Sequence, residues 1–184
     1  MSHGQEQVNH WLAQLGQTIG CGLALNEEGR CSLKAAGDVG IDIFCEPEDT
    51  QFYLSLPLFT LSGLNSREMV LQHALTMNMF QQDTGGASIA LDADGEALLL
   101  CYTHPVEGTE YQTFYNILAN MIESCMELKS QLIESDDRDD EDHHETDEVS
   151  FGVEQHRHAV PASSTRHVTE VSPHETLRYV MNFA

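Results

Sequence analysis

The sequence predicts an α+β fold in the order α-β-β-β-α-β-β-α, with a twisted antiparallel sheet flanked by three helices. Three observations lead to this prediction. Apolar residues recur every three or four positions in three segments, as they do on amphipathic helices. Elsewhere, apolar and polar residues alternate over short runs, as they do on half-buried antiparallel strands. Turn residues such as Gly, Asp and Asn separate these runs.

The first helix is expected over about residues 5–16, and a run of glycines closes it. Its apolar stripe consists of Val8, Trp11, Leu12, Leu15 and Ile19. Alternating segments follow at 23–25, 31–33, 39–45 and 52–56, with turns of three to six residues between them. Such a succession predicts an antiparallel meander.

A second helix is expected over about residues 66–81, where Asn65 and Glu68 have the spacing of a capping box. This helix is apolar on two sides and therefore needs two partners: it is enclosed within the domain, or its second face is a subunit interface. The turn from Asp92 to Gly95 then joins two strands into a hairpin. A third helix begins near Thr109 and carries an apolar stripe as far as Leu132.

The charge is strongly negative and divides the chain. Thirty acidic and eight basic residues give a net charge of −22, and residues 134–148 hold ten acidic residues and one arginine. We therefore expect a folded domain at 1–133, a disordered acidic linker at 134–148 and a C-terminal tail at 149–184. So much negative charge disfavours binding to nucleic acid or to anionic membranes.

The cysteines and the apolar runs favour a soluble intracellular protein. Five widely spaced cysteines lie next to apolar residues, which is typical of reduced, buried thiols. The longest apolar run, residues 97–102, is far shorter than the roughly 18–20 residues of a membrane span. The N-terminus lacks the basic start and the apolar stretch of a signal peptide.

Neither a metal site nor a catalytic site is expected, and no cofactor. The turn at Asp92 and Asp94 lacks the later ligands of a calcium loop, and Cys101 with His104 is only half of a zinc site. The pair His143–His144 stands within the acidic run, where a solvated linker is the simpler interpretation. Catalytic Ser, Cys and phosphate-binding motifs are missing, so we do not expect an enzyme.

Several local sequences in this order resemble a known family, the class I chaperones of bacterial type III secretion (the Tir/CesT-like group). The resemblance covers about residues 5–133, and nothing after Glu134 matches. The stretches that carry it are the first helix ending in Leu15-Gly16, LALNEEGRCSL at 23–33, LQHALTMN at 71–78, IALD at 89–92 and LLL at 98–100.

The resemblance implies a homodimer in the bacterial cytoplasm that binds the N-terminal segment of a secreted effector as an extended chain and contributes to virulence. The secretion-machinery ATPase is a further candidate partner. The side chains expected to line the effector groove are Val8, Trp11, Leu15, Leu33, Ile41, Ile43 and Leu54. Those expected at the dimer interface are Leu75, Met77, Leu98, Leu100 and Tyr102.

Two other functions stay open: a regulatory adaptor on the same fold that sequesters a transcriptional control protein, and an unrelated α+β enzyme. Three roles also stay open for the tail. It keeps the protein soluble, docks to the secretion machinery, or occupies the effector groove through its apolar segments at 149–153 and 177–183.

Overall fold

A computed structural model of the chain describes residues 2–48, 50–79, 84–137 and 181–182. The element order confirms the predicted α+β fold. The helices are α1 (His3–Ile19), α2 (Arg67–Met77) and α3 (Tyr111–Asp137). The strands are β1 (Arg30–Lys34), β2 (Gly40–Phe44), β3 (Gln51–Thr60), β4 (Ser88–Leu91), β5 (Ala97–Pro105) and a short last strand, β6 (Met181–Asn182).

The strands form one antiparallel sheet in the order β4-β5-β3-β2-β1-β6. Along β3 every second side chain is buried, and Leu54 and Leu56 lie opposite Tyr102 and Leu100 of β5. Successive side chains of a strand point to opposite faces, so this alternation assigns one face of the sheet to the core.

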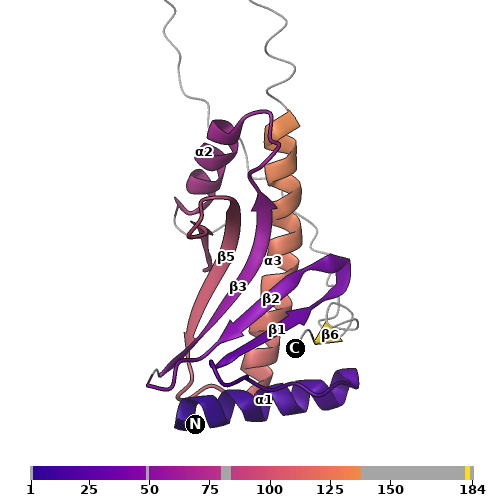
Figure 1. Ribbon diagram of the computed structural model, residues 1–184, viewed down its shortest axis with the longest axis vertical. Coiled ribbons are helices and arrows are strands. Elements are labelled where there is room, and N and C mark those ends of the chain that lie inside the picture. Colours follow the sequence, from indigo (N-terminus) through magenta and orange to yellow (C-terminus); the bar gives the residue numbers. More distant parts are fainter. Residues whose placement is uncertain (1, 49, 80–83, 138–180, 183–184) are drawn as a thin grey trace, which may run out of the picture.

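The three helices pack against the sheet and against one another (Figure 1). The long α3 runs behind the strands, α1 crosses near its beginning, and α2 packs near its end. Trp11 of α1 stacks on Phe114 of α3 with ring centroids 5.2 Å apart. Trp11 also packs in a T-shaped arrangement with Phe52 of β3, with ring centroids 5.8 Å apart. This aromatic cluster joins both helices to the sheet.

Two helix starts differ from the expectation. Helix α1 begins at His3 because Ser2 and Gln5 form a capping box, in which the Gln5 amide donates to the Ser2 hydroxyl over 3.3 Å. Helix α3 begins at Tyr111, and the Thr109 hydroxyl donates to the Pro105 carbonyl at 2.8 Å.

The start of α2 is capped from a distant part of the chain. Its N-cap is Ser66, whose side chain makes no capping hydrogen bond. The Asp136 carboxylate accepts from the backbone amides of Asn65 and Ser66, at 3.4 and 3.0 Å. Helix α3 thus continues past the expected boundary at residue 133, and its last turn lies within the segment expected to be a disordered linker.

Residues 23–25, expected as a strand, are irregular although Leu23 and Leu25 are buried. The Leu25 amide donates to Asn9 Oδ1 of α1 at 2.7 Å, so a helix side chain takes the place of a neighbouring strand. The expected end of the second helix at residue 81 lies outside the described residues, as do the tail and the linker beyond 137 apart from β6.

Candidate partner-binding surface

The hairpin of β1 and β2 is held against α1 by a buried side chain. Gln5 of α1 donates from Nε2 to the Cys45 carbonyl at 2.9 Å. Gly29, directly before β1, has φ +77°, and a Cβ there would lie 2.4 Å from the same oxygen, so only glycine fits. The edge of the sheet formed by β1 is therefore fixed relative to α1.

Strand β1 has an apolar inner side and a polar outer side. Cys31 and Leu33 are buried, whereas Arg30, Ser32 and Lys34 alternate with them on the outside. The Ser32 hydroxyl donates to a carboxylate oxygen of Asp42 on β2 at 2.5 Å. Charged side chains such as Lys34 are typical of strands at a sheet edge, where they discourage unwanted pairing.

The outer side of β1 continues into an aromatic patch. The Arg30 guanidinium carbon lies 4.7 Å from the centre of the Phe44 ring, and this ring lies 6.0 Å from that of Tyr53. Leu99 and Cys101 on β5 are also partly exposed on this face. Among the described residues no helix covers it (Figure 1), so it is open to a partner.

The edge of β1 also accepts a strand from the C-terminal tail. Strand β6 pairs with it antiparallel, with Met181 opposite Lys34 and Asn182 opposite Leu33. The backbone groups of β1 that face away from β2 are therefore able to pair with an extended segment.

At the other end of the sheet, apolar side chains are exposed on α2, just after it, and on the edge strand β4. Met69 and Leu75 lie on α2, Met79 follows it, and Leu91 ends β4. Leu75 has 68% of its surface exposed and Met79 has 60%. We call these four residues the α2/β4 patch, and they lie at the opposite edge of the sheet from β1.

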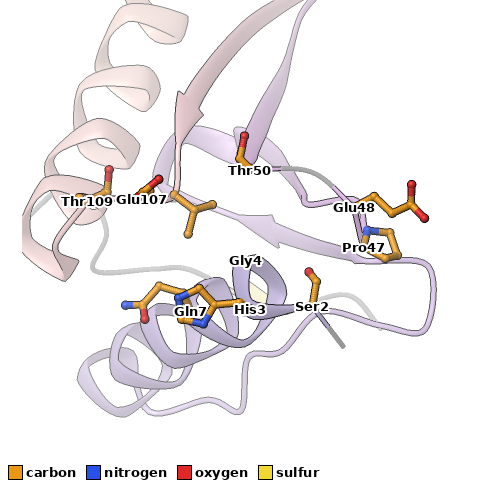
Figure 2. A pocket seen from close by; sticks show the side chains of 11 residues that line it. Ser2, His3, Gly4, Gln7, Pro47, Glu48, Thr50, Glu107 and Thr109 are labelled. Atoms are coloured by element: carbon orange, nitrogen blue, oxygen red, sulfur yellow. The ribbon is translucent and has the colours of Figure 1, made fainter.

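A hollow of about 580 Å³ lies beside the start of α1 (Figure 2). It is lined by Ser2, His3, Gly4, Gln7, Pro47, Glu48, Thr50, Val106, Glu107, Gly108 and Thr109. Two carboxylates and one imidazole suit a basic or hydrogen-bonding group. In the part of the chain that the structure describes, no group of three or more His, Cys, Asp or Glu residues could hold a metal ion.

Three of the five thiols are poorly suited to nucleophilic chemistry. Burial raises the pKa of both Cys31 and Cys125 to about 11, and it also raises the pKa of Cys101. At neutral pH these three groups are therefore protonated, whereas the thiolate is the nucleophile. All five cysteines are described, and no two of them form a disulfide.

The side chains expected to line the effector groove lie inside the domain. Val8, Trp11, Leu15, Leu33, Ile41, Ile43 and Leu54 are at most 2% exposed and belong to one core cluster. In this chain they contact each other rather than a surface. Their role in an effector groove stays a prediction, and in the single chain these residues support the outer surface from beneath.

The side chains expected at the dimer interface are divided between the core and the surface. Met77, Leu98 and Leu100 are buried, and Tyr102 is half-buried beside His104. Leu75 alone of the five is widely exposed. Met77, Leu98 and Leu100 belong to the core of the single chain, and the dimer role of all five stays a prediction. The sequence reasoning missed Met69, Met79 and Leu91, which share the α2/β4 patch with Leu75.

The polar positions of β1 were also missed, although the sequence held a signal for them. On a half-buried strand the apolar residues face inward, and the residues between them form the surface. Arg30, Ser32 and Lys34 hold those intervening positions. The pairing of β6 gave no comparable signal, because it joins segments almost 150 residues apart.

Residues 10–129 match the model of the Tir chaperone protein (CesT) family. This chain belongs to that family. The matched range begins within α1, includes β1 to β5 and α2, and ends within α3. No curated protein sequence matches the chain.

Three solved structures share the fold of this family member. A chain of the ExsC–ExsE complex gives a TM-score of 0.63 at 21% identity, and the match covers 72% of this chain and 97% of that one. The HopA1–SchA chaperone–effector complex gives 0.56 at 14% identity, with 71% and 98% covered. The ExoU–SpcU complex from the type III secretion system of Pseudomonas aeruginosa gives 0.51 at 16% identity, with 71% and 98% covered.

Of the helices that the structure describes, none combines the length and the apolar character that crossing a bilayer requires.

Proposed function

We propose that this chain is a cytoplasmic type III secretion chaperone, without catalytic activity, that holds the N-terminal segment of a secreted effector extended and competent for secretion. The observation that carries the proposal is the family match over residues 10–129. The similar fold of HopA1–SchA, a chaperone–effector complex, supports it further.

The surface offered to the effector segment is the edge of β1 with the aromatic patch beside it. An extended peptide binds such a surface by adding a strand to the sheet, and its alternate side chains contact the face beyond. The pairing of β6 with this edge supports strand addition at β1. The net charge of −22 favours effector segments that are neutral or basic.

The α2/β4 patch is the surface proposed for the homodimer. Its four exposed apolar side chains come from α2, the residues just after it, and β4, the outermost strand at that side of the sheet. In a symmetric dimer each copy contributes the same patch, so every apolar contact occurs twice. This assignment keeps the edge of β1 outside the dimer interface, so each copy can hold part of one effector segment.

The test compares the proteins secreted by the native host with and without this chain. We expect at least one type III substrate to disappear from the medium and to return when the chain is restored. The N-terminal segment of that substrate should co-purify with the chain, without nucleotide and in the presence of chelator.

A substrate of a different secretion route serves as the control and should be unchanged. If no secreted protein changes and the co-purifying protein is a transcriptional control protein, the regulatory adaptor replaces the chaperone. If binding requires ATP or is abolished by chelator, the proposed mode of binding is wrong.

A further inference from the structure

The tail returns to the domain at the edge where strand addition is available. Strand β6 lies beside β1 in Figure 1, with Lys34 opposite Met181 and Leu33 opposite Asn182. In the described part of the chain this pairing covers two of the five residues of β1. An edge strand has one outward row of backbone donors and acceptors, so two segments cannot use the same residues of it.

We propose that the C-terminal segment, residues 175–184, is an internal competitor for the partner site at the edge of β1. This inference rests on the proposed function, because the competing ligand is the effector segment. The same chain then carries both the strand-accepting edge and a strand that occupies it, and effector binding displaces β6.

The chemistry of the C-terminal segment fits the site. Its sequence, ETLRYVMNFA, places Leu177, Tyr179, Met181 and Phe183 at every second position. Tyr, Val and Phe favour extended structure, and alternation is the pattern of a strand with one apolar side. One arginine balances one glutamate, so the segment is neutral in a chain of net charge −22. The same properties are those expected of the effector segment.

The tether makes a weak strand effective. A segment linked to its own site experiences an effective concentration on the order of millimolar. If the isolated segment binds with a Kd of about 0.1 mM, the ratio of occupied to free β1 edge in the full chain is about ten. The apparent affinity for an effector segment is reduced by the free fraction, hence by about tenfold.

The first test needs no effector. A synthetic peptide of residues 175–184 is added to a chain that ends at His174, and amide signals of Leu33 and Lys34 are followed by NMR. We expect saturable shifts at these two amides, with a Kd below the roughly millimolar effective concentration of the tethered segment. A peptide of the same composition in scrambled order should cause none. Binding at another surface, or equal binding of the peptide to the full chain, would overturn the proposal.

The second test closes the contact covalently. In the full chain, Lys34→Cys with Met181→Cys places two thiols at directly opposite positions, where a disulfide can form. Met181→Cys alone controls for the native cysteines. We expect the 34–181 disulfide to dominate in peptide maps of the oxidised double variant, and its absence would contradict the pairing.

The third test uses the N-terminal segment of the secreted protein that co-purifies with the chain. We expect the oxidised double variant to bind it at least tenfold more weakly than the reduced form. We also expect the chain ending at His174 to bind it about tenfold more tightly than the full chain. A full-length variant with Met181→Pro and Asn182→Pro, which removes two backbone donors, should behave like the shortened chain.

These outcomes separate the two proposals. If full and shortened chains bind the effector segment equally, the tail is not a competitor and the chaperone function stands. If neither chain binds a secreted segment while the 175–184 peptide binds β1, the proposed function fails and the intramolecular contact remains.

Discussion

Replacing Leu75 with Glu should separate the proposed dimer without unfolding the domain. Burying a whole leucine side chain contributes about 1.5–3 kcal/mol. Leu75 has 68% of its surface exposed in the single chain, so burying the rest of it in a dimer contributes about 1–2 kcal/mol per copy. Two copies in a symmetric dimer give about 2–4 kcal/mol, and losing this contact weakens dimerisation roughly 30- to 1000-fold.

Sedimentation over a range of protein concentrations measures this loss. The native chain should form dimers, and the variant Leu75→Glu should remain monomeric over most of the range. Gln17→Glu adds the same charge to an exposed position of α1 and should leave the dimer intact. Folding is followed by the fluorescence of Trp11, the single tryptophan, and the stability of the Leu75→Glu monomer should change by less than about 0.5 kcal/mol.

Leu100→Glu provides the contrast, because this side chain is fully buried between strands β3 and β4. A charge at this position should unfold the domain rather than split a dimer. The reasoning is refuted if Leu75→Glu sediments as a dimer with native affinity, and the homodimer itself is refuted if the native chain is a monomer throughout.

Three further predictions concern stability. Gln5→Ala should lower the free energy of unfolding by about 1–3 kcal/mol, because the Cys45 carbonyl loses its buried donor. Urea unfolding measures this loss, and the control variant Gln17→Ala should change the same quantity by less than about 0.5 kcal/mol. Raising the pH from 7.5 to 10 should lower the free energy of unfolding by about 2–3 kcal/mol. In the folded chain Cys31 and Cys125, with pKa values of about 11, keep their protons, whereas in the unfolded chain their thiols have the ordinary pKa of 9.0 and lose them. This loss should largely vanish when both are alanine, and an unchanged loss would contradict the assignment. Asp136→Ala should cost about 1 kcal/mol by removing the acceptor of two amides at the start of α2, and unchanged thermal unfolding would show that this cap does not stabilise the helix.

The element order could be predicted from the sequence because it depends on local periodicity. The stripe of α1 and the alternation in β3 each indicate their structure within a few residues. The turn at Asp92 was also readable: its carboxylate accepts from the amides of Glu96 and Ala97, which is the usual behaviour of Asp in a turn.

What could not be predicted depends on long-range contacts. An apolar residue on a strand is equally compatible with a core and with a groove, so Ile41 and Ile43 were expected at a surface although they are buried. The acidic run was expected to be solvated from residue 134 onward, yet Asp136 caps a helix 70 residues away. The pairing of Met181 with Lys34 likewise depends on the folded sheet and not on local sequence.

The most direct test of the central claim is hydrogen exchange of the chain ending at His174, with and without the N-terminal segment of the co-purifying secreted protein. The account predicts slower exchange at the β1 amides that point away from β2, at Ser32 and Lys34 above all, and an extended conformation of the bound segment. Unchanged exchange along β1, with protection only at α2 and β4, would contradict strand addition at this edge.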